Sequence, residues 1–241
     1  MEFTDMHCHM LFGVDDGPKT EEEMYQMVEA AYADGISTIC LTPHYHPGYF
    51  GNNRTATDQA FELLQSYVLR HCPCLQLFLG NELRYSPDCI SWLEEGCCRT
   101  MNQTRYVLVD FSEQESEKAI IAAIEQILNA GYIPILAHAE RYRNLDIRHQ
   151  RLQEFRENGV LIQIDVQSLF GVFGFSAKYK CKAILTRKLA DLVSSDAHDF
   201  LSRPPLLSKG YEYISQKYGT TYAEDIFRKN ALQILGGTTI N

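Results

Sequence analysis

The sequence predicts an α/β protein in which a parallel sheet, covered by helices, curls into a barrel. Short apolar runs alternate with helix-like segments and give about seven β/α units, and strands joined by helical crossovers pair in parallel. At 241 residues, a closed barrel is favoured over an open sheet. Candidate functional residues follow the apolar runs, as the sites of such barrels require. We expect a single domain over residues 1–241.

The first part of the chain predicts strands and helices in alternation. Phe3 begins a short strand, and Gly13 and Gly17 mark the loop that follows it. Residues 20–23 resemble a capping box, and the amphipathic stretch after them ends at Asp34. The elements expected next are a buried β-branched strand, a polar helix and an apolar strand, over residues 36–42, 55–70 and 75–79.

The second part continues the pattern. Glycines that end predicted helices stand at Gly131 and Gly159, each just before an apolar run. The expected strands cover residues 106–111, 133–137, 160–164 and 192–195, and the expected helices cover 117–130, the segment that ends at Asn158, and 221–235.

Composition excludes several classes of protein. A formal net charge of −9 argues against general electrostatic binding of nucleic acid, although a local basic pocket for phosphate is compatible with it. Hydrophobic residues make up 45% and charged residues 22% of the chain, which is typical of a soluble globular protein. We see no signal peptide and no apolar run near about 18 residues, so we expect a cytoplasmic protein without membrane insertion.

Cysteine usage raises one alternative mechanism. Eight cysteines in a chain without export signals predict free thiols, most of them buried. Cys181 and Arg187 fit the C-x5-R pattern of cysteine-dependent tyrosine phosphatases, in which small, flexible residues wrap phosphate around a reactive thiolate. The intervening Lys-Ala-Ile-Leu-Thr predicts a helix interior instead. We therefore expect Cys181 to be a buried helix residue.

The first strand ends in an unusual group of polar residues. His7 and His9 are two positions apart on a strand, so their side chains point to the same face. Asp15 and Asp16 follow in the glycine-marked loop. Convergent imidazoles beside carboxylates are typical of a metal site, and the alternative is two chance histidines beside a solvated turn. Within the pair of aspartates, Asp16 is the expected ligand and Asp15 a turn residue.

Histidines and carboxylates recur at the ends of successive predicted strands. Because isolated charged groups are costly to bury, such a series is not a core pattern. Its nine members are His7, His9, Asp16, His44, Glu82, Asp110, His138, Asp196 and His198. His46 is left open between ligand and loop residue, and His71 and His149 are expected at the surface.

The residue types in this series indicate the chemistry. Imidazoles and carboxylates without cysteine favour manganese, iron or zinc over a thiolate site. One metal with an open position takes three or four protein ligands, so nine ligands imply two or three metals. Clustered metals activate water and neutralise an anionic transition state, which suits hydrolysis of a phosphate ester. Arg141 and Arg203 follow two of the ligands and fit phosphate binding; the alternative is that both form surface ion pairs.

A family resemblance is carried by the segments MHCHMLFGVDDGP, LTPHYHPGYF, GNELRY, AHAERY, QSLFGVFG and SSDAH followed by RPP. The sequence resembles the PHP superfamily, named for polymerase and histidinol phosphatase. More narrowly, it is similar to the bacterial protein-tyrosine phosphatases of capsular and exopolysaccharide loci. The similarity runs from residue 3 to about residue 235.

The resemblance implies a distorted (β/α)7 barrel with a trinuclear, usually manganese-dependent site. It implies three ligand sets: His7, His9, Glu82 and Asp196; Glu82 as a bridge with Asp110 and His138; and Asp16, His44 and His198. Arg141 and Arg203 match the phosphate-binding arginines of the family. Two positions depart from the family pattern, because Asp110 stands where Glu is common and HAER where HPER is common. The shorter Asp110 puts occupancy of the second metal in question.

The function expected from the resemblance is hydrolysis of phosphotyrosine in a protein. The implied substrate is the tyrosine-rich tail of a bacterial tyrosine autokinase that controls polysaccharide export, with water activated between two metals as the nucleophile. Two alternatives remain open. One is a small-molecule phosphatase of the histidinol-phosphate type, and the other is a non-catalytic adaptor that keeps the fold. The complete ligand set argues against the adaptor.

Overall fold

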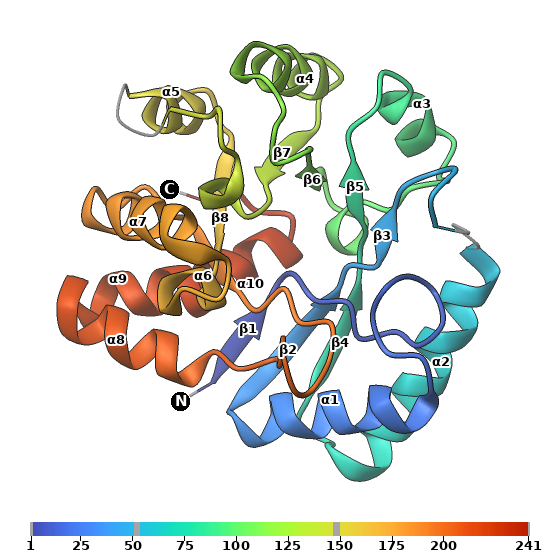
Figure 1. The fold of residues 1–241 in the computed structure, drawn as a ribbon. Coiled ribbons are helices and arrows are strands. Elements are labelled where there is room, and N and C mark those ends of the chain that lie inside the picture. Colours follow the sequence, from blue (N-terminus) through green and yellow to red (C-terminus); the bar gives the residue numbers. More distant parts are fainter. Residues whose placement is uncertain (1, 51–53, 147–149, 241) are drawn as a thin grey trace.

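A computed structural model describes residues 2–50, 54–146 and 150–240. The strands are β1 (Phe3–Asp5), β2 (Ile36–Leu41), β3 (His44–Tyr45), β4 (Gln76–Leu79), β5 (Glu82–Arg84), β6 (Tyr106–Asp110), β7 (Ile133–Leu136), β8 (Leu161–Asp165) and β9 (Leu192–Ser194). The α-helices are α1 (Glu21–Ala33), α2 (Arg54–His71), α3 (Cys89–Glu94), α4 (Glu117–Asn129), α5 (Arg151–Glu157), α6 (Val166–Phe170), α7 (Gly174–Thr186), α8 (Ser208–Tyr218), α9 (Thr220–Glu224) and α10 (Asn230–Leu235). Figure 1 shows the strands in the middle of the molecule and most helices around its periphery.

The strands pair in parallel throughout, in the orders β1-β2-β4 and β3-β5-β6-β7-β8-β9. Short interruptions separate β2 from β3 and β4 from β5, but the hydrogen bonding continues across them. Gly80 N donates to Leu41 O at 2.8 Å, and Glu82 N donates to Pro43 O at 3.2 Å. Each interrupted pair therefore acts as one strand of the barrel.

The sheet closes between its first and last strands. His9 N donates to Ala197 O and Asp196 N donates to His7 O, both at 2.8 Å, and Cys8 and Ala197 form a parallel bridge. With β2–β3 and β4–β5 counted as single strands, the described residues form a distorted (β/α)7 barrel. This confirms the predicted fold class.

Two buried clusters fill the barrel and its shell. Alternate strand residues such as Cys40, Leu108 and Ile135 point inward and pack with Ile234 of α10. The intervening residues, Val107 and Leu136 among them, face the helices outside. The chain therefore buries apolar side chains on both faces of the sheet, which is typical of a parallel sheet between helices.

Several predicted boundaries need correction. The segment before Asn158 is not one helix: a single 3₁₀ turn, Ala139–Arg141, is followed by loop over the described residues 142–146, and α5 begins only at Arg151. The final helix is divided by a π-helical stretch, Asp225–Lys229. The short strands β3 and β5, which begin at His44 and Glu82, were not predicted as separate elements.

Other predictions are confirmed. Thr20 caps α1, because its hydroxyl accepts a hydrogen bond from Glu23 N at 3.2 Å. All eight cysteines are free. Over the described ranges, the helices are too short or too polar to cross a bilayer. His71 is exposed as expected, whereas His149 lies outside the described residues.

Candidate functional site

Two pairs of predicted ligands meet where the barrel closes. The two histidines of the HCH motif flank Cys8, and Asp196 and His198 flank its bridge partner Ala197. Residues on either side of a bridged position point to the same face of a sheet. The first and last strands therefore bring four candidate ligands to one end of the barrel.

The first group of ligands surrounds the closely spaced rings of His7 and His9, whose Nε2 atoms are 3.2 Å apart. Glu82 Oε1 lies 3.4 Å from His7 Nε2, and Glu82 Oε2 lies 3.3 Å from His9 Nε2. Asp196 Oδ1 lies 3.4 and 3.5 Å from the same two nitrogens. All four residues are buried. They are the same four residues that the resemblance places in its first ligand set.

The second group shares Glu82 with the first. His138 Nε2 is 2.9 Å from Glu82 Oε1 and 3.5 Å from Asp110 Oδ1. Despite its shorter side chain, Asp110 therefore reaches the group. Its other oxygen accepts a hydrogen bond from Arg84, which is its register partner on β5.

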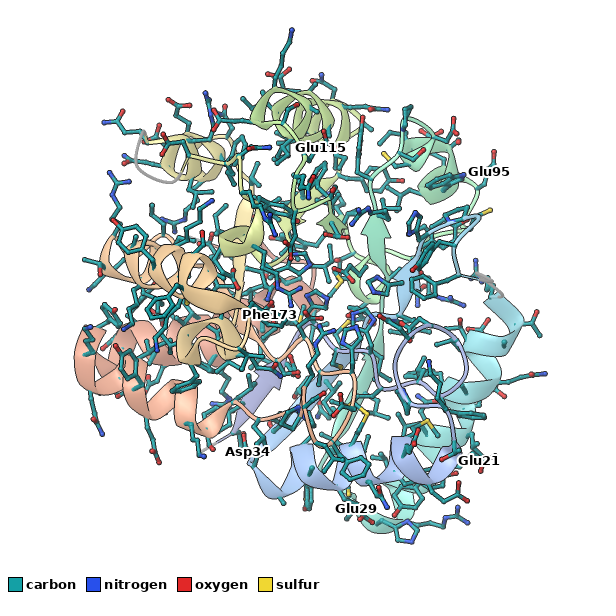
Figure 2. The ribbon with its side chains drawn as sticks, viewed as in Figure 1. Glu21, Glu29, Asp34, Glu95, Glu115 and Phe173 are labelled. Carbon is teal, nitrogen blue, oxygen red and sulfur yellow. The ribbon has the colours of Figure 1, made fainter. Side chains whose placement is uncertain are left out.

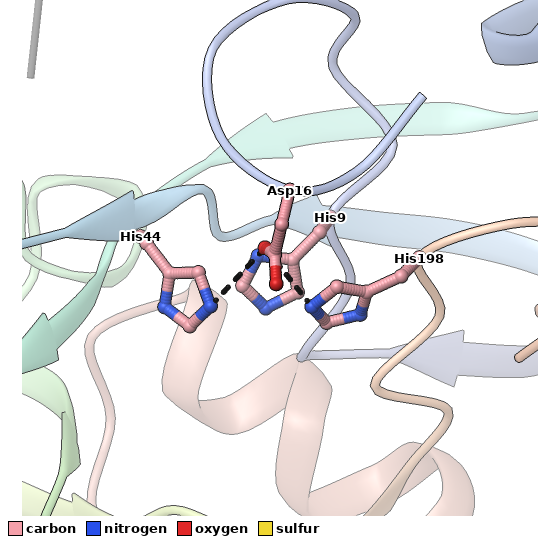
Figure 3. Close-up of side chains that lie close together, drawn as sticks. All are labelled: His9, Asp16, His44 and His198. Carbon is pink, nitrogen blue, oxygen red and sulfur yellow. Dashed lines mark ion pairs between the residues drawn. The ribbon is translucent and has the colours of Figure 1, made fainter. Parts of the chain in front are cut away.

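The third group lies nearest to solvent. Asp16 Oδ1 is 3.4 Å from both His44 Nε2 and His198 Nε2, and His9 lies between these rings, as Figure 3 shows. Glu82 Oε2 also lies 2.8 Å from His44 Nδ1, and His44 pairs with Glu82 in register between β3 and β5. Glu82 therefore faces ligands of all three groups.

Two of these ligands adopt a backbone conformation that is rare outside glycine. His138 has φ +33° and Asp196 has φ +50°, and the left-handed region costs about 1–3 kcal/mol for such residues. His138 lies two positions beyond the end of β7, and Asp196 lies two positions beyond the end of β9. The unusual conformation turns their side chains back over the strand ends toward Glu82 and the HCH histidines.

Two further residues orient the imidazoles. Asp15 Oδ2 lies 2.7 Å from His9 Nδ1 and also accepts from His44 N at 3.0 Å, while Asp15 Oδ1 accepts from Gly17 N. Gln163 Oε1 lies 3.2 Å from His7 Nδ1. With Nδ1 occupied, each ring presents Nε2 to the ligand group, which is how metal-binding histidines are oriented. The expectation that Asp15 is a turn residue is therefore correct but incomplete, and the orienting role of Gln163 was missed.

The charge distribution of the site favours a bound cation. Burial alone lowers the pKa of His9, but Asp15 and Glu82 outweigh it and raise that pKa well above its usual value. Burial and the charge of Arg141 would lower the pKa of His138 in the same way. The hydrogen bond with Glu82 nevertheless raises this pKa to about 9. Buried Glu82 Oε2 has no hydrogen-bond partner among the described residues, although it faces two ring nitrogens. This donor set fits divalent metals, which supply positive charge without protonating the rings.

The predicted phosphate arginines lie beside the ligand groups. Arg141 Nη2 and Arg203 Nη2 donate to Asp196 Oδ2 at 2.6 and 2.5 Å. Arg141 Nε also lies 3.0 Å from Asp165 Oδ2. The side chain of Arg141 is 12% exposed and that of Arg203 is 24% exposed, so both form their ion pairs with Asp196 at partly buried positions.

A cavity of about 260 Å³ opens over these groups. It is lined by the arginines Arg84, Arg141 and Arg203 and by Asp16, His44, Glu82, Asp110, His138, Asp196 and His198. His7 and His9 lie fully buried behind this lining. Two larger hollows occur elsewhere on the described surface, and neither is lined by a predicted ligand. The structure thus brings the nine predicted ligands together, with seven of them lining one polar cavity.

The remaining candidates lie outside the three ligand groups. His46 belongs to none of the candidate ligand groups among the described residues. Its ring stacks on that of Tyr49, with the two ring centres 5.2 Å apart. Cys181 is buried inside α7, where burial raises the pKa of its thiol. A cysteine-dependent phosphatase requires a thiolate at an anion-binding loop, so the structure excludes that mechanism at Cys181.

Comparison with known proteins identifies the family. A family model described as "Capsular polysaccharide synthesis, CpsB/CapC" matches residues 3–236. The chain belongs to the CpsB/CapC family. Among curated relatives, it is 33% identical to the tyrosine-protein phosphatase CpsB of Streptococcus agalactiae serotype III, over 96% of this chain and 97% of that protein. It is 28% identical to the tyrosine-protein phosphatase YwqE of Bacillus subtilis, over 98% of this chain and 92% of that protein.

Solved structures agree with the family assignment. A structure from a study of YwqE from Bacillus subtilis and CpsB from Streptococcus pneumoniae, described as unique metal-dependent tyrosine phosphatases, superposes with a TM-score of 0.88 at 28% identity, covering 99% of this chain and 96% of the other. The histidinol phosphate phosphatase of Lactococcus lactis superposes with a TM-score of 0.59 at 15% identity, covering 91% of this chain and 95% of the other. At that identity, the second match supports the barrel fold alone.

Proposed function

We propose that this CpsB/CapC family member is a metal-dependent phosphotyrosine-protein phosphatase. The observation that carries the proposal is that two ligand groups share Glu82, which also faces His44 of the third group, directly beside two arginines at one cavity. The names of the relatives agree with this activity. Clustered metals beside cationic phosphate donors suit hydrolysis of a phosphoric monoester.

Divalent metals would be held by the three groups described above, and we propose two to three ions, with manganese preferred over iron or zinc. Bound there, they would supply Lewis-acid activation of water and of the phosphoryl oxygens. Asp15 and Gln163 would keep Nε2 of the HCH histidines free for coordination, through their contacts with Nδ1. The absence of cysteine from all three groups is consistent with a harder metal.

Arg141 and Arg203 would bind the phosphoryl group. Both guanidinium groups donate to the same oxygen of Asp196, so their planar N–H edges already converge on a negatively charged centre. Phosphate oxygens entering the cavity next to Asp196 would accept hydrogen bonds from these edges. Because the arginines are largely buried, these bonds would strengthen where negative charge develops in the transition state.

For the substrate, we propose the phosphotyrosine-containing tail of a bacterial tyrosine kinase that controls capsular or exopolysaccharide synthesis. The family description and the relatives' names support this choice. We also propose a cytoplasmic location, because eight free cysteines are typical of a reducing compartment.

The test is an assay of metal-stripped protein reconstituted with manganese. We expect phosphate release from a phosphotyrosine peptide at higher kcat/KM than from histidinol phosphate. A preference for histidinol phosphate would favour the alternative of a small-molecule phosphatase. No release of phosphate from either substrate would favour the alternative of a non-catalytic adaptor.

Substitution of the arginines tests the proposed phosphate contacts. Arg141→Ala and Arg203→Ala should each lower kcat/KM on the order of 30- to 1,000-fold, because a charge-assisted bond that strengthens in the transition state contributes about 2–4 kcal/mol. Lysine should restore activity only partly, since it lacks the planar fork. Metal content and thermal stability serve as controls. Near-normal kcat/KM in both alanine variants would contradict the assignment.

A further inference from the structure

The guanidinium of Arg141 lies against an aromatic ring that none of the ligand groups uses. Its central carbon is 3.7 Å from the centre of the Phe173 ring, and the corresponding carbon of Arg203 is 5.5 Å from that point. We propose that Phe173 is a positioning residue that holds both arginines in the geometry that binds a phosphoryl group. The inference rests on the proposed phosphatase function and adds a residue that shapes its phosphate pocket.

Phe173 lies in a tight turn between α6 and α7. Gly171 and Gly174 flank it with φ of +92° and +86°, and Gly174 N donates to Gly171 O at 3.0 Å. Left-handed φ values of this kind favour glycine, so the sequence GVFG suits the turn. Figure 2 shows Phe173 near the centre of the face in view, whereas Glu21, Glu95 and Glu115 lie toward its edge.

The same turn is tied to the loop that carries Arg203. Gln167 of α6 accepts a hydrogen bond from Val172 N at 3.2 Å through its backbone oxygen. Its side-chain Nε2 donates to the backbone oxygen of Pro204 at 3.3 Å. Gln167 thus links the turn with Phe173 to the residue that follows Arg203.

The contacts of Arg141 explain why the ring matters. Asp165 and Asp196 hold the edge of the guanidinium, at 3.0 Å from Nε and 2.6 Å from Nη2. Phe173 covers its face. A guanidinium is planar and weakly hydrated, so it stacks well on an aromatic ring, and this leaves its N–H edge directed toward an anion. Without the ring, rotation about the end of the side chain would redirect that edge.

The turn also provides a matched control. Phe175 is two positions further on, at the start of α7, and 92% exposed. Among the described ring contacts, the arginines lie over Phe173 rather than over Phe175. Phe175→Ala therefore removes the same kind of side chain from the same turn without removing the support of the arginines.

We expect Phe173→Ala to lower kcat/KM for a phosphotyrosine peptide by about 10- to 30-fold, which corresponds to one partly desolvated cation–π contact. The inhibition constant of inorganic phosphate, used as a competitive inhibitor of the manganese-loaded protein, should rise by a similar factor. Metal content should stay at the wild-type value, and Phe175→Ala should change neither constant.

Two more variants separate the aromatic face from simple bulk. Phe173→Tyr keeps the ring and should retain activity and phosphate affinity within about threefold. Phe173→Leu keeps much of the volume but no π face, and should behave like Phe173→Ala. If Phe173→Ala fails to fold, the comparison of Leu with Tyr still decides. Wild-type phosphate inhibition in Phe173→Leu would overturn the proposal.

The outcomes distinguish this proposal from the proposed function. A wild-type protein that hydrolyses phosphotyrosine, together with a Phe173→Leu variant that binds phosphate normally, overturns the role of Phe173 alone. A wild-type protein that releases no phosphate from any ester and is not inhibited by inorganic phosphate overturns both.

Discussion

At the scale of single residues, two carboxylates connect the parts of the site. Asp196 faces the HCH histidines with Oδ1 and accepts from both arginines with Oδ2. Glu82 lies between histidines of all three ligand groups. Because the two oxygens of each carboxylate have different neighbours, a substitution of Asp196 or Glu82 removes contacts to more than one part of the site.

The number of groups that a carboxylate joins predicts how much metal is lost when it is replaced. Glu82→Gln should remove more metal per chain than Asp110→Asn, because Glu82 faces three groups and Asp110 belongs to one. Elemental analysis after reconstitution with manganese measures the difference.

Glu117→Gln is a suitable control, since Glu117 forms a partly buried pair with Arg151 and belongs to none of the ligand groups among the described residues. Equal metal loss from Asp110→Asn and Glu82→Gln would contradict the bridging position of Glu82. No bound metal in the wild-type protein, even after reconstitution, would contradict the metal mechanism as a whole.

At the scale of elements, the loops at one end of the barrel carry the site, while the helices cover its wall. The loop after β1 brings Asp15 and Asp16, and the turn between α6 and α7 brings Phe173. In contrast, α7 itself packs Cys181 and Ile184 into the core. A helix that buries its cysteine in this way does not form an anion-binding loop.

Cys181→Ser tests this reading of α7. Activity should stay within about twofold of the wild-type value, because the thiol lies in the core and burial raises its pKa. Thermal stability should fall slightly, since a hydroxyl without a partner is costly to bury. Chelation of metal in the wild-type protein should abolish activity. Loss of activity in Cys181→Ser with normal metal content would revive the cysteine mechanism.

At the scale of the whole molecule, closure of the barrel depends on contacts between the two ends of the chain. Asp5 on β1 accepts hydrogen bonds from Ser195 N at 3.0 Å and from Ser195 Oγ at 2.5 Å, directly after β9. Burial raises the pKa of Asp5 to about 6, although the bonds from Ser195 oppose the rise. This closure therefore includes a carboxyl group that the fold favours in its protonated form.

The raised pKa predicts a pH dependence of stability. The contribution of protonated Asp5 to the free energy of unfolding is complete below about pH 4, and it is lost as pH rises through about 6. The free energy of unfolding of the wild type, relative to that of Asp5→Asn, should therefore fall over this interval, by roughly 3 kcal/mol at most. Urea denaturation of metal-free protein at several pH values measures this difference, in which the titrations of groups remote from Asp5 cancel. A difference that is constant with pH would contradict the prediction.

The sequence by itself determined the fold class, the family and the nine candidate ligands. Apolar runs and helix signals are local, so the alternation of elements was readable, and parallel strands place the residues that follow them at one end of the sheet. The histidines of HCH were also readable as a pair, because side chains two positions apart on a strand share a face. The predicted roles of the ligands and of Arg141 and Arg203 stay predictions.

Only the tertiary structure decided which side chains support that site. Asp15 looked like a turn residue, although its partner His9 is only 6 positions away. Phe173 stands in the QSLFGVFG segment of the family resemblance, but neither Phe173 nor Gln163 carried a signal of its role, because their partners Arg141 and His7 lie far away in the sequence. The same holds for the left-handed conformations of His138 and Asp196, which are unusual for these residue types and persist because the surrounding structure holds them. Patterns of neighbouring residues encode strands and helices, whereas orientation within a site arises from contacts that form when distant strands of the barrel come together.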